Sequence, residues 1–200
     1  TLNSQLPMLF SAYVRWRHSK GFGVHSPFAY DVVTTAVRPG KYGFYGYEAI
    51  DEAFFLSGKG IIGRMRHDAR LLLRMVYVLG IKRVFMPADT PLPFVAAVKS
   101  VGAIPVAVKS PRVPLPEPAE GDMIFGDPLC FNPEALEKWV AAGGTAMIVR
   151  GMPMPGMRPI QSLTDIFSKV MTNGLLLYSP RIVVAHPRKE MEFTSYSMKF

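Results

Sequence analysis

Residues 82–91, with the sequence KRVFMPADTP, join a short apolar run to a proline-rich turn. Val84, Phe85 and Met86 are typical of a buried strand, and helical patterns flank the stretch on both sides. In an open α/β sheet, the turn after the first strand faces the crevice in which ligands bind. Glycines usually form such a turn, because only glycine lets the backbone approach a cofactor closely. This turn holds prolines and Ala88 instead, so it indicates an α/β fold without identifying a ligand.

The neighbouring segments predict repeated βα units. Apolar spacing predicts a helix over residues 64–79, and Gly80 supplies its stop. A helix over 93–101 and a strand over 104–108 complete a βαβ unit, whose sheet should be parallel. The same pattern continues with strands at 122–126 and 145–149, and with helices at 133–142 and 160–171.

The two ends of the chain differ from this repeat. Helical spacing over 6–17, and the Ser26-Pro27 start of a helix over 27–37, predict a helical preface. Apolar runs at 175–178 and 182–185, with period-two alternation over 195–200, predict an antiparallel hairpin at the sheet edge. We therefore divide the chain into a preface over residues 1–63 and an α/β domain over residues 64–200.

Composition narrows the class of protein. Two hundred residues, 49% of them hydrophobic, suit one globular domain with a sizeable core. No apolar run reaches the roughly 18 residues that would suggest a membrane span. Pro7, Arg15 and Arg17 interrupt any signal-peptide core, and Cys130 is the single cysteine, which excludes an internal disulfide and a multi-cysteine metal site. We expect a cytoplasmic protein without a metal centre. The sequence leaves open whether it forms an oligomer.

Positive charge is concentrated in the first half. Residues 1–109 hold 14 Lys and Arg against 6 Asp and Glu, whereas residues 110–200 hold 9 of each. Arg66, Arg70 and Arg74 form a stripe at helical spacing. The stripe is either a phosphate grip, since arginine forks bind phosphate bidentately, or a solvated outer face. With Arg15, Arg17 and Arg64, it indicates an anionic partner or a basic surface that keeps the protein soluble.

A helical preface, parallel βα units and a terminal hairpin together resemble class I S-adenosylmethionine-dependent methyltransferases. The stretch Gly23–Phe28, GVHSPF, is similar to the preface of a bacterial group assigned to this class. The resemblance implies a Rossmann-like, methyltransferase-type sheet, mostly parallel, with a C-terminal antiparallel hairpin. Only 13 residues separate the strand at 104–108 from Asp122, so the sheet should be truncated by one helix and strand.

The resemblance fails at the residues that should bind the cofactor. Met86 stands where the family has an acid, Ala88 and Leu92 stand where it has glycines, and Lys109 replaces the acid that holds the ribose. If a pocket is retained, the resemblance makes these positions candidates for S-adenosylmethionine contacts: Met86, Ala88, Asp89, Thr90, Lys109 and Asp127.

Two residues are candidates for catalysis. Asp127-Pro128 matches the first two positions of the motif with which amino-group methyltransferases place their target nitrogen, and Asp-Pro after a strand is also an ordinary turn. His25 precedes a helix cap and titrates near neutral pH, so it is either an acid–base group or a structural partner of the preface. Cys130 reads as a small buried thiol.

Three functions follow from these patterns. The first is a degenerate methyltransferase-like domain without catalysis or cofactor, which serves in binding or regulation. The second is an active S-adenosylmethionine-dependent methyltransferase of unknown substrate. The third is an anion- or nucleic-acid-binding module, whose affinity would fall steeply with salt.

Overall fold

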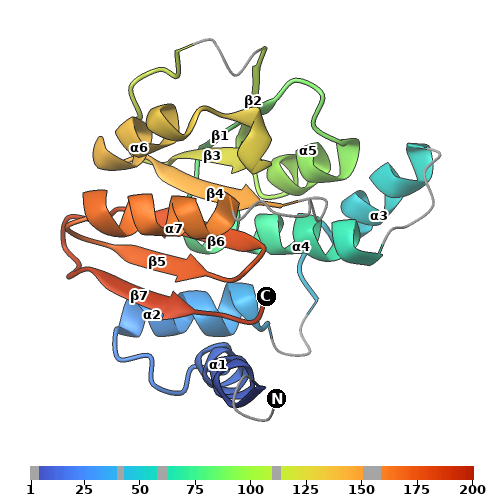
Figure 1. The fold of residues 1–200 in the computed structure, drawn as a ribbon. Helices are drawn as coiled ribbons and strands as arrows, with labels where there is room; N and C mark the ends of the chain where they lie inside the picture. Colours follow the sequence, from blue (N-terminus) through green and yellow to red (C-terminus); the bar gives the residue numbers. More distant parts are fainter. Residues whose placement is uncertain (1–4, 40–42, 58–62, 110–113, 151–158) are drawn as a thin grey trace.

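The computed structural model describes residues 5–39, 43–57, 63–109, 114–150 and 159–200, which form an α/β fold around one sheet (Figure 1). Within these residues, seven strands follow the order β2-β1-β3-β4-β6-β5-β7. Four of the six neighbouring strand pairs are parallel, which confirms the predicted α/β class with a mostly parallel sheet. The strands are β1 Arg83–Pro87, β2 Ile104–Val108, β3 Asp122–Gly126, β4 Thr145–Val149, β5 Leu175–Tyr178, β6 Ile182–His186 and β7 Thr194–Ser197.

The βαβ unit that begins within residues 82–91 forms as its sequence pattern predicts. Helix α5 (Leu92–Lys99) connects β1 to β2, and these strands pair in parallel with Arg83 opposite Ile104. On its other side β1 pairs directly with β3, Arg83 opposite Asp122. The described residues 114–121 between β2 and β3 contain neither helix nor strand. Nothing in this part of the chain therefore adds a strand beyond β2.

The C-terminal strands correct one prediction. The hairpin of β5 and β6 is present, but it does not form the sheet edge, because β6 lies between β4 and β5 and is antiparallel to both. The edge is β7, which pairs in parallel with β5. Tyr196 and Met198 are buried in the core, so the alternation over 195–200 reflects an edge strand that is covered on one face.

Helices cover both faces of the sheet. Alternating residues of each strand point to opposite faces, so Val84 and Met86 join one core cluster and Phe85 joins the other. The first cluster packs under α2 (Pro27–Val32), the π-helical turn η2 (Val33–Val37), α3 (Tyr47–Leu56), α4 (Gly63–Val78) and α5. The second packs under α6 (Pro133–Ala141) and α7 (Pro159–Val170).

The helices of the preface and the residues that follow α1 (Gln5–His18) all contact the rest of the fold. Ala29, Val32 and Ile50 are fully buried in the same cluster as α4. At the end of α1, the Ser19 hydroxyl accepts a hydrogen bond from the Lys199 amide at 2.7 Å. The preface therefore lies against β7 and α4, as Figure 1 shows for α1 and α2.

Helix α3 is an element that the sequence patterns do not predict. It begins after Gly46, whose φ of +96° is left-handed, and no side chain caps it. A Cβ at Gly46 would lie 2.5 Å from the Ser100 Cβ, so the glycine allows this close approach to α5. Because the cap is a glycine and not Ser, Thr, Asp or Asn, the start of the helix carries only a weak local signal, Glu48 in its first turn.

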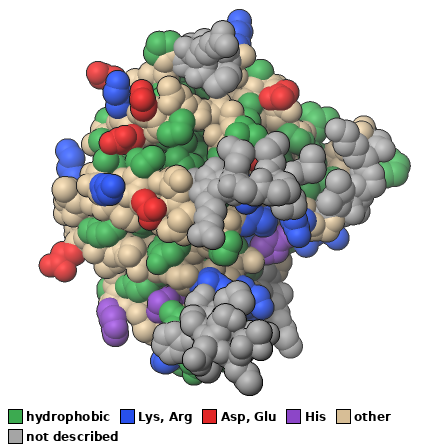
Figure 2. Space-filling model, viewed as in Figure 1, with side chains coloured by type: hydrophobic (Ala, Val, Ile, Leu, Met, Phe, Trp, Pro, Cys, Tyr) green, Lys and Arg blue, Asp and Glu red, His purple; other side chains and the backbone are tan. Residues whose placement is uncertain are grey.

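Charged side chains are distributed differently over the helices that Figure 2 shows. In Figure 2, Asp and Glu are interspersed with Lys and Arg over α6 and α7, whereas Lys, Arg and His gather over α4. In this view, part of the basic excess of the first half of the sequence lies over α4.

Candidate functional site

The carboxyl ends of β1, β2 and β3 lie at one edge of the sheet, where an open α/β sheet usually binds its ligand. This arrangement brings the segment after β1, with Ala88 and Asp89, beside Lys109 after β2 and Asp127 after β3. Met86 does not reach this edge, because its side chain is buried in the core on the α5 side.

The turn after β1 is closed on itself. The Thr90 hydroxyl donates a hydrogen bond to the Pro87 carbonyl at 2.6 Å, and the Thr90 amide donates to the same oxygen at 3.0 Å. The Ala88 amide donates to the Val108 carbonyl at 3.1 Å, which extends the β1–β2 ladder by one step. These two backbone amides are therefore already engaged within the protein.

An aromatic ring packs over the end of β3, on the face of the sheet that α6 and α7 cover. A Cβ placed on Gly126 would lie 2.7 Å from the Phe131 ring and 3.3 Å from the Pro87 Cδ. Phe131 itself is 5% exposed. The glycine at the end of β3 thus accommodates a side chain of the protein, and sequence reasoning missed this role of Phe131.

Asp127 caps the short turn that carries Phe131 into place. Its Oδ1 accepts a hydrogen bond from the Leu129 amide at 3.0 Å, at the start of the 3₁₀ turn η3 (Pro128–Cys130). Burial, together with the nearby charges of Asp127 and Asp89, raises the pKa of the Cys130 thiol. The structure therefore gathers two carboxylates around a thiol that stays protonated at neutral pH.

His25 lies in another part of the molecule. Its side chain is exposed, and its backbone amide donates to the Tyr196 hydroxyl at 3.4 Å, beside β7. Three strands separate β7 from β3 in the sheet, so the structure does not bring His25 and Asp127 together. Among the described residues, no three His, Cys, Asp or Glu side chains are grouped to hold a metal ion.

A basic pocket of about 600 Å³ opens beside α4. Arg66, Arg70 and Arg74, the predicted stripe, all line it, and Arg74 is only 4% exposed. The interpretation of the stripe as a solvated outer face is therefore wrong. The three arginines do share one face of α4, but α3 and the residues after η2 pack against that face. The lining is Val37, Arg38, Pro39, Gly43, Tyr47, Gly63, Arg66, His67, Arg70, Arg74, Lys199 and Phe200.

Asp51 of α3 orients two of these arginines. Arg66 donates to both oxygens of Asp51, and the Arg70 Nη2 donates to Oδ2 at 3.0 Å. The hydrogen bond from Arg66 is the main cause of the lowered pKa of Asp51, and the charges of both arginines contribute to it. The carboxylate thus stays ionised and holds the two guanidinium groups together.

Arg74 is held by neutral partners instead. Its Nε donates to the Ala36 carbonyl and its Nη1 to the Tyr47 hydroxyl, both at 2.6 Å. Burial lowers the pKa of Arg74, and the charge of Arg70 lowers it further. The ring of Tyr47 also lies 4.5 Å from the guanidinium carbon of Arg70. Tyr47 and Asp51 escaped sequence reasoning because they belong to the helix that no cap signal marked.

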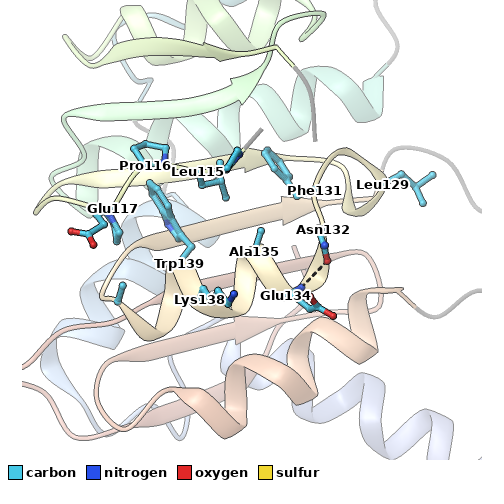
Figure 3. A pocket seen from close by; sticks show the side chains of 13 residues that line it. Leu115, Pro116, Glu117, Leu129, Phe131, Asn132, Glu134, Ala135, Lys138 and Trp139 are labelled. Carbon is cyan, nitrogen blue, oxygen red and sulfur yellow. Dashed lines mark hydrogen bonds between the residues drawn. The ribbon is translucent and has the colours of Figure 1, made fainter. Parts of the chain in front are cut away.

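A second, more apolar groove of about 760 Å³ lies beside α6 (Figure 3). Its walls are the proline-rich segment 114–118 on one side and α6 on the other, with Phe131 between them. Trp139 lines it and donates its indole N–H to the Thr145 carbonyl at 2.9 Å. Leu129 points away from the other labelled side chains in this view. The charged residues Glu117, Glu134 and Lys138 lie along the groove without converging on one point.

A scan against models of protein families finds no match for this chain, and neither do comparisons with curated proteins and with solved structures. None of the helices in the described ranges combines the length and the apolar character needed to cross a membrane.

Proposed function

We propose that this chain is a degenerate methyltransferase-like domain that has lost catalysis and S-adenosylmethionine binding, and that it serves as a binding or regulatory domain. The sequence of parallel βα units followed by the β5–β6 hairpin supports the methyltransferase-type assignment, because the resemblance rests on that order of elements.

The observation that carries the loss of cofactor binding is the position of Phe131. Its ring, with Pro87, occupies the space above Gly126 at the ends of β1 and β3. In an open α/β sheet a nucleotide cofactor lies in this crevice, close to the backbone. Insertion of an adenosyl group there would require the buried ring to leave the core first.

The donor set of the site supports the same conclusion. Met86 faces the core, and Lys109 offers no acceptor to ribose hydroxyls. Asp127 is engaged in capping η3. The two positions at which a methyltransferase of this class would hold its cofactor with a carboxylate, Met86 and Lys109, therefore carry no acid.

Calorimetric titration with S-adenosylmethionine and, separately, with S-adenosylhomocysteine tests the proposal. We expect no binding heat up to about 1 mM ligand, which corresponds to about −4 kcal/mol of binding free energy. A cooperative urea transition on the same sample shows that the protein is folded. Micromolar binding of either ligand would overturn the proposal in favour of an active methyltransferase, and Asp89→Asn and Asp127→Asn would then be the first variants to compare.

A further inference from the structure

The basic pocket beside α4 holds more positive charge than the described carboxylates around it neutralise. Five lining residues are cations: Arg38, Arg66, Arg70, Arg74 and Lys199. None of the described lining side chains is acidic, and Asp51 behind the pocket faces two of the five cations. The neighbouring carboxylate of Asp68 is engaged by Arg181. A concave surface of one charge sign focuses the field and attracts counter-ions.

Arg74 and Arg70 are the two pocket cations with an unmet electrostatic or hydrogen-bonding need. Within the part of the chain that the structure describes, Arg74 is buried without a carboxylate partner. The Nε of Arg70 is buried and has no hydrogen-bond partner among the described groups. A buried charge without a counter-charge is costly, and an anion in the pocket would lower that cost.

The lining indicates the chemistry of that anion. Guanidinium forks match the oxygens of a phosphate, and adjacent turns of α4 present Arg66, Arg70 and Arg74 along one side of the pocket. A volume of about 600 Å³ lies in the range of small-molecule sites. Because Arg74 is buried, a terminal phosphate can approach it more readily than the phosphodiesters within a polymer can. Tyr47 and Phe200 add aromatic surface for an organic group.

We propose that this pocket binds a small soluble ligand through a terminal phosphate or diphosphate group. Arg70 and Arg74 contact the phosphate, Arg38 and Lys199 contribute charge at the rim, and Asp51 is a positioning residue that keeps Arg66 and Arg70 in place. The inference goes beyond the proposed function and is independent of it, because the pocket lies beside α4 and not at the ends of β1 and β3.

Calorimetric titration of the whole chain with sodium pyrophosphate, at near-neutral pH and about 0.15 M salt, tests the site. We expect saturable binding that weakens at least about tenfold in Arg70→Gln and in Arg74→Met, since each loses charge-assisted hydrogen bonds. Arg64→Gln is the matched control, because Arg64 is exposed on the same helix and does not line the pocket. Its affinity should stay within about twofold of the unmodified protein.

Two further binding experiments decide the remaining outcomes. If Arg74→Met fails to fold, then Arg38→Gln and Lys199→Gln, both at exposed positions, should each weaken pyrophosphate binding by about threefold. The absence of binding by the folded protein, or equal losses in Arg64→Gln and Arg70→Gln, would overturn the proposal. Tighter binding of a single-stranded oligonucleotide than of pyrophosphate, with a steep salt dependence, would overturn it in favour of a nucleic-acid surface.

Discussion

Asp68 on α4 and Arg181 in the turn between β5 and β6 form a two-pronged ion pair, with Arg181 Nη1 donating to the Asp68 Oδ2 at 2.7 Å. Asp68 is almost completely buried, whereas Arg181 remains partly exposed. The pair therefore joins the helix that precedes the first strand to the β5–β6 hairpin.

Loss of the Asp68 carboxylate should destabilise the fold. We expect Asp68→Ala to lower the free energy of unfolding in urea by about 3 kcal/mol, because Arg181 then keeps a poorly solvated charge without its partner. The exposed pair of Arg188 and Glu190 is the control, and Glu190→Gln should cost about 0.5 kcal/mol or less. Equal urea midpoints for Asp68→Ala and the unmodified protein would contradict this expectation.

Stability should also depend on the protonation of His186. This ring stacks on Phe28, and its Nδ1 lies 2.9 Å from the Thr145 hydroxyl. Burial, with a smaller contribution from the charge of Arg188, lowers the pKa of His186 to about 4. The unfolded chain therefore binds more protons than the folded chain between the ordinary histidine pKa of 6.5 and about 4.

The sign of this linkage gives the expected pH profile. The contribution of His186 is fully present above the unfolded pKa and is lost as the pH falls toward about 4, with a total of about 3 kcal/mol. Urea unfolding across that window should show the loss, and His186→Gln should flatten it. The lowered pKa values of Asp51, Asp68 and Asp122 act below this window, since their ordinary value is 3.8. An identical slope in His186→Gln would assign the loss to another group.

Alanine substitutions at two glycines with left-handed backbone distinguish the cost of a steric clash from the cost of conformational strain. A Cβ on Gly174 would clash with the His186 carbonyl oxygen, which is backbone and cannot move aside. Gly143 has a similar positive φ but open space around the added atom. We expect Gly143→Ala to cost about 1–2 kcal/mol from strain alone, and Gly174→Ala to cost at least about 2 kcal/mol more. Equal losses in thermal or urea unfolding would show that the β5–β6 region relaxes around the methyl group.

Phe131→Ala tests the filled crevice separately from the missing carboxylates. Removing the buried ring should lower the free energy of unfolding by about 3–4 kcal/mol. S-adenosylmethionine should still fail to bind, because an opened cavity supplies no acceptor for its ribose. Leu129→Ala in the same loop is the control, since that side chain is 58% exposed and should contribute little. Binding by Phe131→Ala alone would identify the ring as the only obstacle.

Local periodicity was sufficient to predict most of the repeated elements. Strands β2 to β4 have the predicted ranges, β1 lies within the stretch 82–91, and α4 to α7 differ from their predicted ranges by a few terminal residues. Buried residues repeat every second position in a half-covered strand and at three- to four-residue intervals in a helix, so this information is local. Helix α3 is the exception, because it begins at a glycine made necessary by contact with α5, and α5 lies far along the chain.

The candidate sites depend on contacts between distant segments of the chain, which the spacing of residues in the sequence does not encode. The stripe of Arg66, Arg70 and Arg74 is visible in the sequence, but its burial follows from Asp51, Tyr47 and the Ala36 carbonyl on separate segments. In the same way, the sequence marks the loss of cofactor-binding residues, whereas only the packed loop places Phe131 against Gly126. Local sequence specifies which face of an element is apolar, and the packing of distant segments specifies which groups meet there, because those contacts form only when the whole core closes.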